Sequence, residues 1–170
     1  LMAWMKIRHG WEIERDWILM APGVVPSLHA AALAFAEAGE GIIVQPPVYF
    51  PFFSSVTTPG RRLIENPLRQ ENGRYRIDFE HLERCAAQAD ARMLLFCSPH
   101  NPVGRVWDAG ELREVLRVAR RHGLVVLSDE IHHDLIYPEQ QHLPLARLAD
   151  DPGDIVTAVA PSKTFNIPGL

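Results

Sequence analysis

The chain has 170 residues, which is enough for one domain of ordinary size, and we expect residues 1–170 to form a single domain. Apolar residues make up 47% of it and charged residues 22%, the balance of a soluble globular protein. The net charge of −4 gives no electrostatic basis for binding nucleic acid or an anionic membrane, and no apolar stretch reaches transmembrane length. Two cysteines do not make a disulfide framework, so we expect reduced thiols and a cytoplasmic protein.

Short apolar runs alternate with helical patterns along the whole chain. The runs rich in Ile, Val and Leu predict strands at Gly41–Gln45, Arg62–Glu65, Arg92–Cys97, Leu124–Ser128 and Ile155–Ala160. The helical patterns predict helices at Val24–Glu37, Phe50–Thr57, Asp78–Gln88 and Asp108–His122. The last helix has the clearest pattern, because Asp108 and Glu111 make a capping box and Gly123 follows its final turn.

This alternation of strands and helices predicts an α/β fold of three layers, α/β/α, around a mostly parallel sheet. The chain begins without an initiator methionine and stops inside a patterned region. We therefore expect the domain to be incomplete at both ends.

Polar and aromatic side chains follow four of the five predicted strands. Tyr49 follows the first strand, Asn101 the third, Asp129 the fourth and Lys163 the fifth. Ligands of open α/β sheets bind at the carboxyl ends of the strands. If these four strands are neighbours, the four side chains converge on one crevice.

An amine and a carboxylate in one crevice suggest a specific chemistry. Lys163 is one of only two lysines in a chain that otherwise uses arginine, so its amine matters more than its charge. In a partly dry crevice the neutral form of an amine is favoured, and this form attacks an aldehyde to give a Schiff base. An acid such as Asp129 can keep a pyridine nitrogen protonated. These are the two protein groups that pyridoxal phosphate requires.

The other residues of the crevice suit the remaining parts of that cofactor. Tyr49 could stack on the ring, and Asn101 could donate to its phenolic oxygen. A phosphate group needs backbone N–H groups at the start of a helix, and Val24 and Val25 begin one directly after Gly23. The hydroxyl of Ser162 lies beside the lysine in sequence and could join them.

Each of these residues also has a purely structural interpretation. Asp129 and Glu130 could begin a helix, Tyr49 could pack within a loop, and Asn101 with Pro102 is a turn signature. His100 and His132 remain candidates for acid–base or hydrogen-bonding roles. The functional hypothesis depends on the joint placement of these residues at successive strand ends.

A metal site is the competing chemistry for the segment "SDEIHHDL". Its spacing matches neither H-E-x-x-H nor a Cys/His zinc pattern. Adjacent His132 and His133 cannot both point the same way from a regular element. We therefore expect no metal. There is also no Gly-rich nucleotide loop and no G-x-S-x-G nucleophile elbow.

Five ordered segments, "PGVVPSL", "QPPVYFPF", "CSPHNPVGRVW", "SDEIHHDLIY" and "APSKTFNIPGL", resemble a known family over nearly the whole chain. They are similar to the pyridoxal-phosphate-dependent enzymes of the class I/II aminotransferase fold, whose large domain is a fold-type-I α/β/α unit. Within that group they resemble the MalY/PatB-type cystathionine β-lyases, since "SPHNPVGRVW" and "DEIH" differ from the usual aminotransferase motifs.

The resemblance implies a role for each matching position. Lys163 would be the Schiff-base lysine and the base for the substrate's Cα proton, and Asp129 would pair with the pyridine nitrogen. Asn101 would bond the phenolic oxygen, with His132 near it in place of a tyrosine, and Tyr49 would stack on the ring. The phosphate would be held by Val24, Val25 and Ser162.

The resemblance also implies an activity, namely cleavage of L-cystathionine or a related L-cysteine S-conjugate to a thiol, pyruvate and ammonia. An aminotransferase on the same scaffold is the alternative, and an inactive fragment or a binding domain that keeps the fold is the alternative of another class. Family members are longer homodimers with a C-terminal small domain, absent here, and a substrate-carboxylate arginine in their later part.

Overall fold

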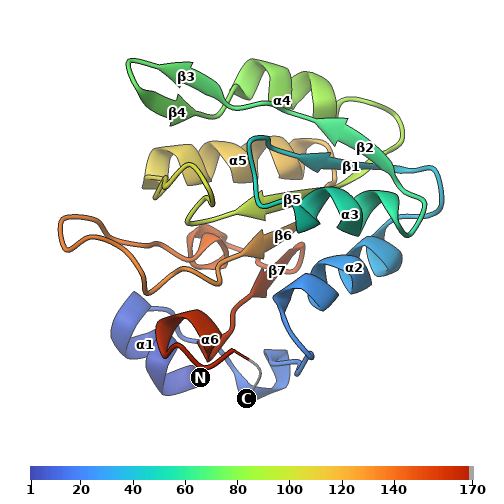
Figure 1. Cartoon of the computed structure of the whole chain (residues 1–170). Coiled ribbons are helices and arrows are strands. Elements are labelled where there is room, and N and C mark those ends of the chain that lie inside the picture. Colours follow the sequence, from blue (N-terminus) through green and yellow to red (C-terminus); the bar gives the residue numbers. More distant parts are fainter. Residues whose placement is uncertain (169–170) are drawn as a thin grey trace.

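A computed structural model of the chain describes residues 1–168 and contains a five-stranded sheet in the order β2-β1-β5-β6-β7 (Figure 1). Every neighbouring pair in this sheet is parallel, as the sequence predicts. The strands are β1 (Gly41–Val44), β2 (Arg62–Glu65), β5 (Ala91–Cys97), β6 (Val125–Asp129) and β7 (Ile155–Ala158).

Helices cover both faces of the sheet. Successive residues of a strand point to opposite sides, so the apolar residues of each strand present two apolar faces that helices bury. Leu94 and Phe96 of β5 pack into one buried cluster with α4 (Phe79–Ala86) and α5 (Ala109–Arg121). Met93 and Leu95 pack into the other with the helices α2 (Val24–Phe35) and α3 (Pro51–Thr57). The predicted three-layer α/β/α architecture is thereby confirmed.

Several elements were not predicted from the sequence. They are α1 (Met2–His9), the 3₁₀ turns η1 (Arg15–Trp17) and η2 (Leu145–Leu148), the antiparallel hairpin β3 (Arg69–Glu71) and β4 (Arg74–Arg76), and α6 (Pro161–Thr164). The first and last helices lie side by side (Figure 1), with the rings of Trp4 and Phe165 at 5.4 Å between centroids. Of the helices in the described range, none is long and apolar enough to cross a bilayer.

The strand order determines where ligand-binding groups can gather. The strands β1, β5, β6 and β7 are consecutive neighbours, and all of them run the same way. Their carboxyl ends therefore meet at one edge of the sheet, which satisfies the condition on which the predicted crevice depends.

Helix α5 carries a complete capping box at its amino end. The Asp108 carboxylate accepts a hydrogen bond from the Glu111 backbone N–H at 2.9 Å, and the Glu111 carboxylate accepts one from the Asp108 N–H at 3.0 Å. Both of these N–H groups would otherwise lack a partner at the start of the helix.

Replacement Asp108→Ala is therefore expected to lower the free energy of unfolding by about 1 kcal/mol, whereas Asp108→Ser retains most of it. Exposed Arg113 lies on the same helix, and Arg113→Ala is the matched control, with an expected change within about 0.5 kcal/mol. Urea unfolding of the three variants measures this, and equal losses in Asp108→Ala and Arg113→Ala would contradict it.

Candidate functional site

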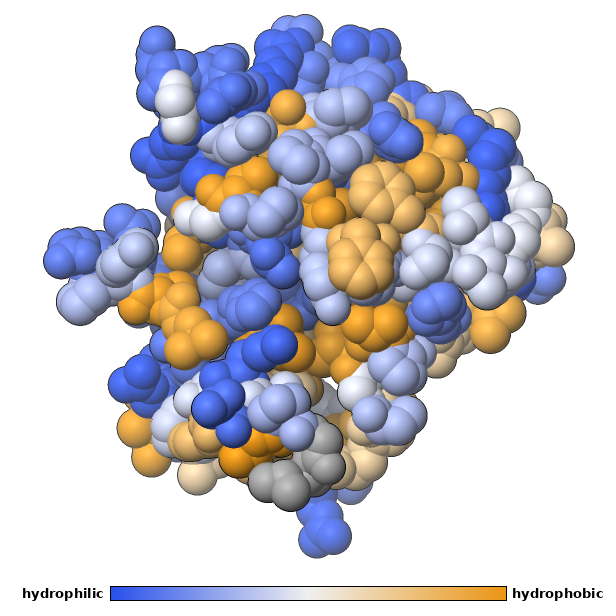
Figure 2. Space-filling model, in the orientation of Figure 1, coloured by the Kyte–Doolittle hydropathy of each residue, from blue (hydrophilic) through white to orange (hydrophobic). Residues whose placement is uncertain are grey.

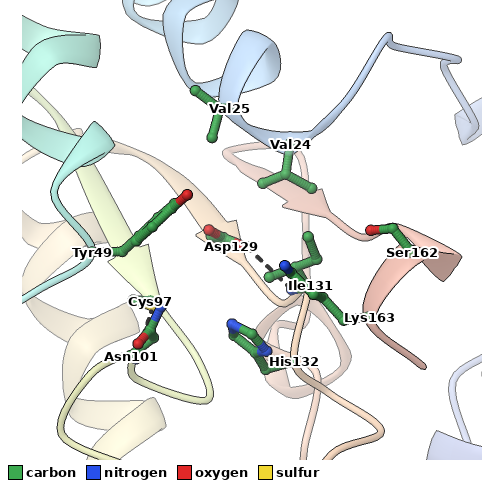
Figure 3. A pocket seen from close by; sticks show the side chains of 10 residues that line it. All are labelled: Val24, Val25, Tyr49, Cys97, Asn101, Asp129, Ile131, His132, Ser162 and Lys163. Carbon is green, nitrogen blue, oxygen red and sulfur yellow. Dashed lines mark hydrogen bonds between the residues drawn. The ribbon is translucent and has the colours of Figure 1, made fainter. Parts of the chain in front are cut away.

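A cavity of about 250 Å³ lies where the carboxyl ends of the parallel strands meet (Figure 3). All eight residues that the sequence singles out line it, together with two that it does not. The lining residues are Val24, Val25, Tyr49, Cys97, Asn101, Asp129, Ile131, His132, Ser162 and Lys163. Residues up to 139 positions apart in the chain are thus brought to one place.

Asp129 is the last residue of β6 and is only 4% exposed. Within the described residues its carboxylate accepts a single hydrogen bond, from the Ile131 backbone N–H at 3.1 Å (Figure 3). Burial raises the pKa of Asp129 to about 6, although the Ile131 N–H acts in the opposite direction, and the negative charge of Glu130 adds to the rise. A buried acid of this kind stabilises a cationic group placed beside it.

Lys163 and Ser162 lie on the single turn of α6, which begins at Pro161, three residues after Ala158 ends β7. The sequence predicts a partly dry crevice around the lysine, and this is wrong for the chain as described. No residue of α6 is buried, and the Lys163 side chain is exposed while lining the cavity. The amine nevertheless points toward the Asp129 side of the cavity (Figure 3).

Tyr49 and Asn101 come from the loops after β1 and β5, and these loops are joined. The Tyr49 backbone N–H donates to the Asn101 carbonyl at 2.9 Å, and the His100 ring Nε2 lies 3.1 Å from the Pro47 carbonyl, to which it can only donate. Burial lowers the pKa of His100 to about 4, so the ring is neutral. His100 does not line the cavity, and its place indicates a structural role for this acid–base candidate.

The two adjacent histidines diverge, as the sequence predicts. His132 lines the cavity, and burial, with the nearby charges of Lys163 and His133, lowers its pKa. His132 is therefore a neutral hydrogen-bonding ring at neutral pH. His133 points away from the cavity into a buried cluster with His9 and Asp134.

The start of α2 supplies backbone donors to the cavity. Gly23 precedes it with φ 151°, a backbone conformation that residues other than glycine rarely adopt. Space alone does not require glycine, since a Cβ there would meet nothing closer than 3.6 Å. Val24 and Val25 are the first helical residues, and their N–H groups have no carbonyl one turn earlier within the helix. An anion in the cavity would therefore meet two free backbone donors.

Cys97 and Ile131 line the cavity but were not among the predicted site residues. Cys97 is the last residue of β5, so the strand-end rule that finds Asp129 also finds Cys97. Burial and the negative charge of Asp129 raise the pKa of the Cys97 thiol, which therefore stays protonated and acts as part of the cavity floor.

The structural alternative for Asp129 and Glu130, a helix start, is wrong. Residues 131–134 form turns, and Glu130 is fully buried. Its carboxylate accepts from Ser128 Oγ at 2.8 Å and from the Leu145 N–H at 2.9 Å, and it lies 2.8 Å from His142 Nε2. The neighbouring acid is thus committed to internal contacts, which leaves Asp129 as the acid that faces the cavity.

The donor set of the cavity fits the cofactor that the sequence suggests. It combines a primary amine, a buried carboxylate short of partners, an amide side chain, an aromatic ring, a hydroxyl and two free backbone N–H groups. An aldehyde, a ring nitrogen, a phenolic oxygen, a flat ring and a phosphate each find a matching group there. The roles of the individual residues stay predictions.

Comparison with known proteins agrees with this reading of the fold. The family model described as "Aminotransferase class I and II" matches residues 1–170. Cystathionine beta-lyase PatB of Bacillus subtilis is 46% identical over 99% of this chain and 44% of its own length. Protein MalY of Escherichia coli is 32% identical over 98% of this chain and 42% of its own length.

A solved structure extends the likeness to three dimensions. Cystalysin from Treponema denticola, whose crystal structure contains a pyridoxal 5'-phosphate cofactor, superposes with a TM-score of 0.97 at 43% identity. The match covers 99% of this chain and 43% of cystalysin, so the chain spans less than half the length of the relatives that it matches. The fold and the resemblance to MalY/PatB-type proteins are thereby confirmed, and the chain belongs to the aminotransferase class I and II family.

Proposed function

We propose that the chain belongs to a pyridoxal-phosphate-dependent carbon–sulfur β-lyase. Its substrates would be L-cystathionine or related L-cysteine S-conjugates, and its products a thiol, pyruvate and ammonia. The observation that carries this proposal is the cavity in which the Lys163 amine faces the buried Asp129 carboxylate. The 46% identity to a protein named cystathionine beta-lyase supports the choice of reaction.

In this proposal each cavity residue binds one part of the cofactor. Lys163 holds it covalently, and Asp129 keeps the ring nitrogen protonated. Asn101 donates to the phenolic oxygen, and Tyr49 stacks on the ring face. The phosphate is bound by a final group of donors, the N–H groups of Val24 and Val25 and the hydroxyl of Ser162.

When bound, pyridoxal phosphate supplies an electron sink for negative charge at the substrate's Cα. Lys163 then accepts the Cα proton as general base. The electron pair left at Cα would form a Cα=Cβ bond as the Cβ–S bond breaks, and the departing thiolate would take the proton that Lys163 holds and leave as a thiol. His132 lies close enough to Lys163 for the lysine's charge to lower the pKa of the His132 ring. We assign neutral His132 a hydrogen bond to the phenolic oxygen or to the substrate.

An aminotransferase is the second candidate, because the matching family model carries that name and the same residues would serve both reactions. The complete protein is therefore assayed with L-cystathionine in the presence and absence of a 2-oxo acid. We expect pyruvate and thiol to form without any acceptor. Strict dependence on the 2-oxo acid would favour the aminotransferase. Absence of both activities from a cofactor-loaded protein would favour the third alternative, an inactive fragment or binding domain.

We also propose a homodimer. The described surface exposes large apolar side chains, among them Leu19, Met20 and Phe50, and the first two are more than nine-tenths exposed. Figure 2 shows apolar surface, in orange, among polar patches across the middle of one face. Exposed apolar surface of this kind is typical of protein–protein contacts, and a second subunit could cover the exposed side of Lys163.

Two further proposals concern the setting of the chain. We propose that residues 1–170 are one domain, the cofactor-binding part of a longer enzyme, since the chain spans 44% of the length of PatB. The remaining length would include a small domain and an arginine for the substrate carboxylate. We also propose a cytoplasmic location, which the two free, buried thiols Cys85 and Cys97 support.

A further inference from the structure

Asp134 is a buried carboxylate outside the cavity that joins three separate segments. Its Oδ2 accepts hydrogen bonds from Trp4 Nε1 of α1 and from Thr164 Oγ1 of α6, each at 2.9 Å. His9 Nε2 lies 3.0 Å from Oδ1, and His133 Nε2 lies 3.1 Å from Oδ2. The side chain of Asp134 is only 4% exposed. The first and last helices of the chain are thus tied to the segment after β6.

The partners of Asp134 keep it ionised despite its burial. Burial alone raises the pKa of the carboxyl, but donors from Thr164, Trp4 and His9 and the charge of His133 hold the pKa below its ordinary value. His133 is itself fixed, because its Nδ1 lies 2.5 Å from the Glu130 carbonyl while its Nε2 faces Asp134. The cluster is therefore a rigid anchor for any group that bonds to it.

The element that most depends on this anchor is α6. It has four residues, no side-chain cap and no buried residue. Its backbone hydrogen bonds run to neighbours within the same segment, as in Phe165 N–H to the Pro161 carbonyl at 3.0 Å. Within the described residues, the Thr164 hydroxyl is the side chain of α6 that bonds to the rest of the protein. Thr164 directly follows Lys163.

We propose that Asp134 is a positioning residue for Lys163. By holding the Thr164 hydroxyl it fixes α6, so that the Lys163 amine stays directed into the cavity. Trp4 and His9 hold Asp134 in turn, which makes α1 part of the support of the site. This inference rests on the proposed function of Lys163 as the covalent anchor.

The same cluster includes a group of metal-binding residue types. Ligand atoms of His9, His133 and Asp134 lie within 4.8 Å of one another. Trp4 Nε1 and Thr164 Oγ1 already donate to Asp134 Oδ2, and the indole N–H of Trp4 has no lone pair with which to ligate a metal. Hydrogen bonds therefore account for the cluster without an ion, and the test below includes a chelation arm.

The test uses the two lysines as reporter and internal reference. The purified protein is incubated with pyridoxal phosphate, reduced with borohydride, and digested, and the modified Lys163 and Lys6 peptides are quantified by mass spectrometry. Lys6 is exposed and pairs with Glu12, and although it shares α1 with Trp4 and His9, its own side chain is not among the contacts of Asp134. The ratio of adduct at Lys163 to adduct at Lys6 measures how well the amine is positioned, independently of turnover.

Thr164→Val removes the hydroxyl at nearly constant volume, and we expect it to lower this ratio about tenfold, the effect of losing a hydrogen bond to a charged group. Thr164→Ser should restore the ratio. Trp4→Phe, which keeps the ring beside Phe165 but removes the donor to Asp134, should lower it less. The matched control is Thr57→Val, since among the described residues the Thr57 hydroxyl donates to the carbonyl of Phe53 within its own helix.

The outcomes separate this inference from the proposed function. A wild-type ratio of adduct near one would mean that Lys163 is not the residue that attaches the cofactor, and both proposals would fail. A high wild-type ratio that survives Thr164→Val would overturn the positioning role alone. If chelation with EDTA lowers the wild-type ratio, a metal rather than the hydrogen bonds holds the cluster, and the inference is likewise overturned.

Discussion

Lys163→Ala is expected to lose covalent cofactor attachment completely and to lose at least about 10³-fold in turnover. One side chain would supply both the anchoring amine and the group that takes the substrate's Cα proton. Lys163→Arg should fail as well, because a guanidinium stays protonated and cannot form the link. Retaining the positive charge at this position is thus not enough.

The control for this prediction is the chain's other lysine. Lys6 is exposed and forms an ion pair with Glu12 at 2.7 Å, so Lys6→Ala should leave both attachment and turnover unchanged. The near-visible absorption band of the bound cofactor and lyase turnover are measured in all variants. A band of equal strength in Lys163→Ala would show that another group holds the cofactor.

The sheet and the cavity could be predicted because they depend on local patterns. Each predicted strand was found within two residues of its predicted ends. The three inner strands β1, β5 and β6 are largely buried, as expected for strands covered on both faces, whereas the edge strands β2 and β7 are partly exposed. Asp129 was then located by a general property of parallel sheets, and Lys163 by the same property together with the rarity of lysine in the chain. Helix α5 was equally clear because its cap and stop residues are local.

The remaining elements depend on contacts that no local pattern encodes. Helix α1 carries no strong signal in "MAWMKIRH", and what fixes it is the tie from Trp4 and His9 to Asp134, more than 120 residues away. The β3–β4 hairpin had a usable signal that was missed, the Asn72-Gly73 pair with positive φ at both residues. The directions of His132 and His133 could be predicted to differ, but their destinations could not.

Asp129→Asn is expected to raise the stability of the cofactor-free protein at pH 7 by on the order of 3 kcal/mol, because burial raises the pKa of this carboxyl from its ordinary value of 3.8 to about 6. At neutral pH the group is ionised in the folded state, and no side chain of the described residues is close enough to form an ion pair with it, so the folded state bears the cost of burying the charge. A neutral amide of nearly equal shape does not bear it.

The sign can be checked through the pH dependence. Between about pH 4 and 6 the folded protein binds a proton at Asp129 that the unfolded chain has released, so the free energy of unfolding of the wild type should fall as pH rises through this window. This contribution should be missing from Asp129→Asn and present in Asp16→Asn, a control at an exposed aspartate. Denaturant unfolding at a series of pH values measures it, and identical pH profiles of wild type and Asp129→Asn would contradict it.

With the cofactor the same substitution should act in the opposite direction. A protonated ring nitrogen would give the Asp129 carboxylate the partner that it lacks, so cofactor binding should raise the melting temperature of the wild type more than that of Asp129→Asn. Turnover of the variant should fall by at least about 10², the effect of removing one preorganised electrostatic group. A substitution that stabilises the empty protein and impairs the loaded one would show that this carboxylate is kept for the ligand. If Asp129→Asn instead lowered the stability of the empty protein, the carboxylate would have a structural role, and its assignment to the ring nitrogen would have to be abandoned.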